Sequence, residues 1–171
     1  MKTLLSTETI AERVKELGKE ISDSYGDTPF IMLVILKGSF IFAADIARAI
    51  TSPNLTMDFV RLSSYQGTTS TGKVAIHEDD VSRLQGSKIL IVEDIVDTGN
   101  TLIWFKKYLK NNGVTDVKIC SLLEKSSVHQ NRIAIDFCGF DIPNKFVVGY
   151  GLDVDGRLRQ LPYIAEYDGV S

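Results

Sequence analysis

An uninterrupted apolar run, FIMLVIL at positions 30–36, constrains the fold more than any other feature of this sequence. Half-exposed strands alternate apolar and polar residues, whereas an unbroken apolar run is typical of a strand buried on both faces of a parallel sheet. Residues 88–92 have the same character. Further strands are predicted at 55–62, 116–123, 133–140 and 146–148, and helices at 10–21, 40–50 and 101–110. Strands that alternate with helices predict an α/β fold, with a mostly parallel twisted sheet flanked by helices.

Length and composition are those of an ordinary globular domain. The chain has 171 residues, of which 44% are apolar and 24% charged, so we expect one domain, 1–171. The net charge is −3 with both signs mixed along the chain, which argues against nucleic acid as a partner. No stretch of about 18 apolar residues predicts a membrane span, and the N-terminus leads into a helical pattern without a signal peptide. Cys120 and Cys138 are interpreted as reduced thiols, so a cytoplasmic location is predicted.

The segment at positions 89–101, ILIVEDIVDTGNT, carries the strongest chemical signal. An apolar strand ends in Glu93 and Asp94, and a short loop with Asp97 and Gly99 leads into a helix. The start of a helix binds phosphate well, because free backbone N–H groups and the helix dipole face it there. Carboxylates beside it can accept hydrogen bonds from two vicinal hydroxyls or face a divalent cation. An acidic loop that only caps a helix is the alternative, but three buried acids repel one another unless they have ligands.

Three other segments are candidates for a site only in combination with residues 89–101. Residues 63–72 are polar and without period, and such long loops are functional lids or disordered segments. Lys37-Gly38, taken alone, is an ordinary strand–helix turn. Lys125 follows a predicted strand, where a solvated lysine is the ordinary interpretation. His77 and His129 are predicted to be surface or loop residues.

Residues 92–99, VEDIVDTG, resemble the signature of the type I phosphoribosyltransferases, and specifically their hypoxanthine(-guanine) branch. Matches to the family continue in order from residue 36 to residue 159. The resemblance implies a purine salvage enzyme that uses Mg²⁺. Its substrates would be 5-phosphoribosyl 1-pyrophosphate and a 6-oxopurine, its products IMP or GMP and pyrophosphate. It also implies a mobile lid at about 63–76, a small hood from the terminal segments with its purine-binding part at about 146–165, and a homodimer or homotetramer.

The resemblance also implies a role for each matching residue. Asp97 would be the general base near N7 of the purine, and the Leu36–Lys37 peptide bond is often cis in the family. Val154 stands where relatives carry an aromatic residue, and Asn100 stands where they often carry lysine. The implied roles are ribose and metal binding by Glu93 and Asp94, 5-phosphate binding by Asp97, Thr98, Gly99, Asn100 and Thr101, pyrophosphate binding by Lys37, Gly38 and Arg159, purine binding by Lys125, Phe146, Val147 and Asp153, with Asp153 also facing the metal, and a lid that includes Ser63, Ser64 and Tyr65.

Other functions remain open from the sequence. A regulatory protein could use the same loop to sense a metabolite, but it would need a DNA-binding extension or a basic face. Adenine and pyrimidine enzymes usually lack an acid at the position of Asp97. A flavodoxin-like phospho-acceptor domain would not require Thr98-Gly99 and a long lid, and a dinucleotide-binding fold would need G-x-G-x-x-G, which is absent. Hypoxanthine, guanine and xanthine differ at C2, and the sequence leaves the choice among them open.

Overall fold

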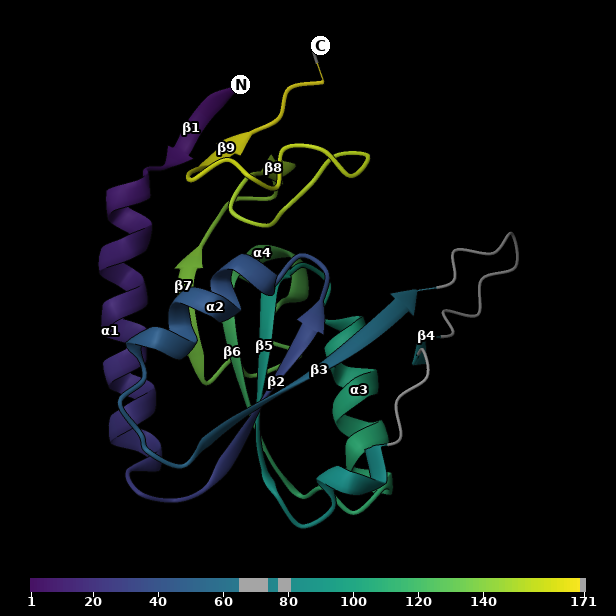
Figure 1. Cartoon of the computed structure of the whole chain (residues 1–171). Coiled ribbons are helices and arrows are strands. Elements are labelled where there is room, and N and C mark those ends of the chain that lie inside the picture. The colour runs from purple at the N-terminus through teal and green to yellow at the C-terminus, as the bar shows by residue number, and fades with distance from the viewer. Residues whose placement is uncertain (65–73, 77–80, 170–171) are drawn as a thin grey trace.

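A parallel sheet forms the centre of the molecule (Figure 1). The computed structural model describes residues 1–64, 74–76 and 81–169. In this part of the chain the sheet has the strand order β4-β3-β2-β5-β6-β7, and only the edge strand β4 is antiparallel to its neighbour. The mostly parallel α/β sheet predicted from the apolar runs is therefore confirmed. The strands are β2 (Phe30–Leu36), β3 (Leu55–Ser64), β4 (Val74–Ile76), β5 (Lys88–Val96), β6 (Asp116–Glu124) and β7 (Phe137–Asp141).

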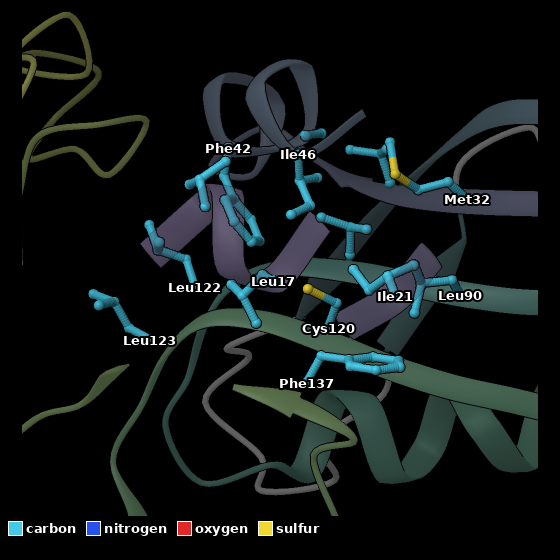
Figure 2. Packing of buried hydrophobic residues seen from close by; sticks show 14 of the residues in the cluster. Leu17, Ile21, Met32, Phe42, Ile46, Leu90, Cys120, Leu122, Leu123 and Phe137 are labelled. Atoms are coloured by element: carbon cyan, nitrogen blue, oxygen red, sulfur yellow. The ribbon is translucent and has the colours of Figure 1, made fainter. Parts of the chain in front are cut away.

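Helices cover both faces of this sheet, as the two sides of β2 and β5 show. Met32, Val34 and Leu90 belong to a core cluster with α1 and α2, whose packing is drawn in Figure 2. Leu33 and Ile91 alternate with them along the strands and pack with α3 instead. Because successive side chains of a strand point to opposite faces, both faces of the central strands are buried. The helical elements are α1 (Thr7–Tyr25), α2 (Phe40–Ala49), the 3₁₀ turn η1 (Val81–Leu84), α3 (Asn100–Asn111) and the short α4 (Ser126–His129).

A small antiparallel sheet brings the two ends of the chain together above the central sheet (Figure 1). It consists of β1 (Lys2–Leu5), β9 (Ile164–Glu166) and β8 (Val147–Val148), in that spatial order. The predicted hood from the terminal segments is therefore present. The expectation that the N-terminus enters a helix directly is wrong, because β1 precedes α1. β1 is a short strand whose pairing partner, β9, lies at the other end of the chain.

Three strand boundaries differ by two or more residues from those predicted. β5 continues to Val96 because its ladder with β6 continues, with Ile95 opposite Leu123. β3 likewise includes Ser63 and Ser64, which pair with β4. β7 begins at Phe137 rather than at 133, since the Asp136 carboxylate accepts the Ile119 N–H at 2.8 Å just before the ladder begins. The longer β5 includes Glu93 and Asp94 and continues two residues beyond them.

Two further expectations concern chemistry outside the site. Both cysteines are free thiols, with Cys120 buried and Cys138 half-buried. Burial raises the pKa of the Cys138 thiol to about 12. None of the helices described is long and apolar enough to cross a membrane.

Candidate active site

A cavity of about 280 Å³ opens at the carboxyl ends of β2 and β5. This is where open parallel sheets bind ligands, because the loops that follow neighbouring strands meet at that edge. Its wall includes the acidic end of β5, the turn after β2 and the loop that leads into α3. From the predicted site, the cavity is lined by Lys37, Gly38, Glu93, Asp94, Asp97, Thr98, Gly99 and Thr101.

Two adjacent carboxylates form one side of this cavity. Glu93 Oε1 accepts hydrogen bonds from the Ser39 hydroxyl at 3.3 Å and the Asp94 N–H at 3.1 Å. Asp94 Oδ1 accepts from the Ile95 N–H at 2.8 Å. Burial, and then the neighbouring Asp94 charge, raise the pKa of Glu93 well above its usual range. A pair of crowded acids at a cavity wall has the chemistry to receive hydroxyl groups or a divalent cation.

This raised pKa predicts that Glu93→Gln stabilises the ligand-free protein. Folded Glu93 binds its proton more tightly than the unfolded chain does, so the free energy of unfolding falls as the pH rises above the ordinary glutamate pKa. We expect E93Q to melt a few degrees higher than wild type at pH 7, with a difference that shrinks toward pH 4. Thermal melting at both pH values measures this, with Glu12→Gln, at an exposed position of α1, as the matched control. Equal melting temperatures of E93Q and wild type at pH 7 would contradict the prediction.

Residues 97–99 join the acidic strand to α3, and together with Asn100 and Thr101 of the first helical turn they form the segment called here the phosphate-binding loop 97–101. Gly99 has φ +76°, a left-handed conformation that favours glycine, and it directly precedes the helix. The Asn100 N–H donates to Thr98 Oγ1 at 3.3 Å. The positive end of α3 therefore lies at the cavity, where it favours an anion. Asn100 itself is exposed and is not part of the cavity wall, so asparagine in place of the lysine that relatives often carry leaves the wall unchanged.

The turn after β2 packs tightly between the carboxylates and the hood. The Leu36–Lys37 peptide bond is cis, as the resemblance implied. A Cβ atom added to Gly38 would lie 1.6 Å from Asp94 Oδ2, and one added to Gly151 would lie 2.1 Å from the Gly38 carbonyl oxygen. Arg159 does not line this cavity, but its guanidinium donates to the Gly151 carbonyl at 2.5 Å. It also pairs with Asp153 at 2.6 Å, so the hood carries both residues close to the turn.

A second cavity of about 160 Å³ adjoins the first, because Ile95 and Asp97 line both. Its walls come from the end of β5, from Lys125 after β6 and from the hood. Phe146 is 56% exposed and meets Tyr167 edge-on, with ring centroids 6.0 Å apart. Phe146 is therefore not a core residue. The other residues that line this cavity are Lys145, Val147, Leu152 and Asp153.

Lys125 is the buried cation of this second cavity. Its side chain is 8% exposed, and its ammonium lies 3.2 Å from Asp97 Oδ2 and 3.3 Å from Asn144 Oδ1. Its backbone N–H donates to the Val96 carbonyl at 2.9 Å, which fixes the start of the side chain beside β5. A buried ammonium with two acceptors keeps a third N–H to donate to a ligand.

Residues 1–155 match the family model described as a phosphoribosyl transferase domain. A hypoxanthine-guanine phosphoribosyltransferase of Mycobacterium avium is 43% identical over 96% of this chain and 84% of its own length. The chain belongs to the hypoxanthine-guanine phosphoribosyltransferase family. A family member of the same name from Bacillus subtilis is also 43% identical, over 95% of this chain and 91% of its own. In solved structures, a Bacillus anthracis hypoxanthine-guanine phosphoribosyltransferase has a TM-score of 0.90, with 38% identity and 98% of each chain covered.

Membership in the hypoxanthine-guanine phosphoribosyltransferase family confirms the resemblance drawn from residues 92–99. The chain is a phosphoribosyltransferase of purine salvage with the fold of that family. The role assigned to each residue stays a prediction. The structure gathers most of those residues around two adjoining cavities, but it divides the three acids predicted to face a metal: Glu93 and Asp94 line the first cavity and Asp153 lines the second.

The structure also corrects one prediction and adds residues to the site. His129 is 1% exposed, so it is not a surface residue; its ring lies against Glu124, with Nε2 3.2 Å from Oε2. Asn144 and Lys145 were missed, although both directly precede Phe146. Tyr65 and His77 lie outside the described residues, and Ser63 and Ser64 belong to β3.

Proposed function

We propose that this chain transfers the 5-phosphoribosyl group of 5-phosphoribosyl 1-pyrophosphate to N9 of hypoxanthine, and also of guanine, giving IMP or GMP and pyrophosphate. The observation that carries the proposal is the shared wall of the two cavities. One cavity has an acidic strand end beside a helix start, and the other has a buried lysine beside an exposed aromatic ring. Asp97 stands between them, where the sugar and the base would be joined.

The first cavity suits a sugar phosphate. The 5-phosphate would bind at the start of α3, held by backbone N–H groups and the hydroxyls of Thr98 and Thr101. Glu93 and Asp94 would accept hydrogen bonds from the two ribose hydroxyls. The turn at Lys37 and Gly38 would receive the pyrophosphate, and Arg159 would add a charge-assisted hydrogen bond to it.

A magnesium ion fits the acids that the chain offers. Glu93 and Asp94 crowd each other at the cavity wall, and Asp153 stands beside Arg159 on the hood. Among the described residues, no three histidine, cysteine or acidic side chains form a metal cluster. Mg²⁺ is commonly bound by one or two carboxylates, with substrate oxygens and water as its other ligands. When bound, the ion supplies positive charge that stabilises the departing pyrophosphate.

The second cavity suits a 6-oxopurine. Phe146 would stack on the purine ring, and the backbone of Val147 would meet its edge. Lys125 would donate its remaining N–H to the 6-oxo group, and an amino group at that position would offer it no acceptor. Asp97 would take up the proton that the purine loses when N9 bonds to the sugar. Positive charge that develops on the sugar carbon would be stabilised by the carboxylates at the ribose.

The test is pyrophosphate release from 5-phosphoribosyl 1-pyrophosphate with Mg²⁺, with hypoxanthine, guanine, xanthine or adenine added one at a time. We expect turnover with hypoxanthine and guanine and at least 100-fold less with adenine, because a site built to hydrogen-bond one substrate group can reject an analogue that lacks it by up to about 10⁴- to 10⁵-fold. Equal turnover with adenine would contradict the role of Lys125. If no base gave turnover while the sugar pyrophosphate still raised the melting temperature, the regulatory sensor would be the better account.

Three further predictions accompany this function. We propose that the enzyme works in the cytoplasm, and that it assembles as a homodimer or homotetramer. The lid predicted at about 63–76 falls mostly on residues outside those described, and we keep it as a proposal. Its physical reason is that a cation-like sugar must be shielded from water during transfer.

A further inference from the structure

We infer that Arg132 is a positioning residue that orients the phosphate-binding loop from outside the cavity. The inference rests on the proposed function, because it concerns how the loop 97–101 presents its N–H groups to the 5-phosphate. Arg132 does not line either cavity of the site. Its guanidinium instead donates from Nη2 to the Thr98 carbonyl oxygen at 2.7 Å and from Nε to the His129 carbonyl oxygen at 3.3 Å.

The contact with Thr98 fixes the direction of one peptide unit. In a trans peptide the C=O and the N–H point in opposite directions. When Arg132 holds the Thr98 oxygen on the outer side of the loop, the N–H of Gly99 is turned to the opposite side, where Thr98 and Gly99 line the cavity. Without this hydrogen bond, the peptide unit before a glycine could rotate at small cost, because Gly99 tolerates many backbone conformations.

The next residue supports the same loop by packing. A Cβ atom added to Gly99 would lie 2.8 Å from Ile133 Cγ2, so Ile133 is pressed against the bare backbone of the loop. Ile133 is buried, with 7% of its surface exposed. Two consecutive residues therefore hold the loop, one by a charge-assisted hydrogen bond and one by contact.

Arg132 is held in place by the buried residue His129. His129 is buried, its ring meets Glu124, and its carbonyl oxygen also accepts the Arg132 backbone N–H at 3.0 Å. Between them, Gln130 and Asn131 have φ of +49° and +57°. A left-handed backbone is strained for residues other than glycine. The chain accepts this strain in the turn that brings Arg132 back to Thr98.

The test compares Arg132→Lys and Arg132→Gln with wild type. Lysine keeps the charge but lacks the planar fork that reaches two carbonyl groups at once, so both variants should lose the orientation of the loop. The readout is the affinity for IMP and for inosine, which differ only in the 5-phosphate. We expect both variants to bind IMP about tenfold more weakly, as loss of a charged hydrogen bond predicts, with inosine affinity changed less than twofold. The KM for 5-phosphoribosyl 1-pyrophosphate should also rise in both variants, while the KM for hypoxanthine stays unchanged.

Arg48→Gln is the matched control, because Arg48 is an exposed arginine that pairs only with a neighbour on α2, Asp45, in the contacts described. It should leave both affinities unchanged. Unchanged IMP affinity in the Arg132 variants would overturn the inference, and so would an equal loss for inosine and IMP, since that indicates general damage. Wild type that failed to bind IMP would instead contradict the proposed function.

Discussion

Gly38→Ala should reduce kcat/KM by about 10²- to 10³-fold, while the protein still folds. The added Cβ atom would lie 1.6 Å from Asp94 Oδ2, far inside van der Waals contact. The turn cannot retreat on its other side, because the Gly38 carbonyl already packs against Gly151 of the hood. Either Asp94 leaves the cavity wall or the pyrophosphate turn moves, and misplacing a reacting group by about 1 Å can cost 100-fold in rate.

A second glycine provides the control for this experiment. Gly86 lies in the turn before β5, has φ +76° and has open space where a Cβ atom would be added. Gly86→Ala should therefore lower stability by about 1 kcal/mol, the cost of a left-handed alanine, and leave turnover intact. Steady-state kinetics and thermal melting of both variants measure the contrast. If G38A kept wild-type kcat/KM, the close packing of the turn against Asp94 would have no part in catalysis.

The central strands and the acidic strand end were accessible from sequence because each depends on local pattern. An apolar run such as FIMLVIL has few alternatives to a doubly buried strand, and the residues that follow such strands meet at one edge of a parallel sheet. This is why Glu93 and Asp97 could be placed at one edge of the sheet from the pattern alone, whereas Lys125 was assigned to the site only through the family resemblance. The structure adds that Asp97 lines two adjoining cavities, one with Glu93 and the other with Lys125.

The elements that were missed depend on partners far away in the chain. β1 exists through its pairing with β9, more than 150 positions later, and its four residues carry no signal of their own. His129 was expected at the surface, but Glu124 offers its ring a partner inside the protein. Arg132 follows a turn made by Gln130 and Asn131, which carries no glycine to mark it. In these cases the decisive contact is tertiary, and local periodicity does not encode it.

The burial of Lys125 links the two cavities energetically. A lone buried ammonium is costly, and here the Asp97 carboxylate balances its charge while Asp97 and Asn144 both accept its hydrogen bonds. Asp97 is 53% exposed, so it meets both the lysine on one side and the open cavity on the other. The same carboxylate would thus hold Lys125 in place for the purine and remain free to receive a proton. These two roles must be separated by experiment.

Asp97→Asn separates them, and we expect it to lower kcat by about 10²- to 10⁴-fold, the usual contribution of a general base. The amide oxygen of D97N can still accept a hydrogen bond from Lys125, so the lysine stays positioned while the base is lost. The KM for hypoxanthine should therefore change little. Asp155→Asn is the matched control, because Asp155 is an 84% exposed hood residue that is 4.0 Å from its nearest charged partner, Arg157; it should leave kcat unchanged.

A second substrate makes the test specific for proton transfer. 8-Azaguanine loses its ring proton more readily than guanine, so its transfer depends less on a base, and Asp97→Asn should reduce its kcat far less than that of guanine. If the two purines suffered the same loss, Asp97 would act by positioning rather than by accepting the proton. If D97N retained full turnover with guanine, Asp97 would have neither role, and the proton would have to leave directly to water.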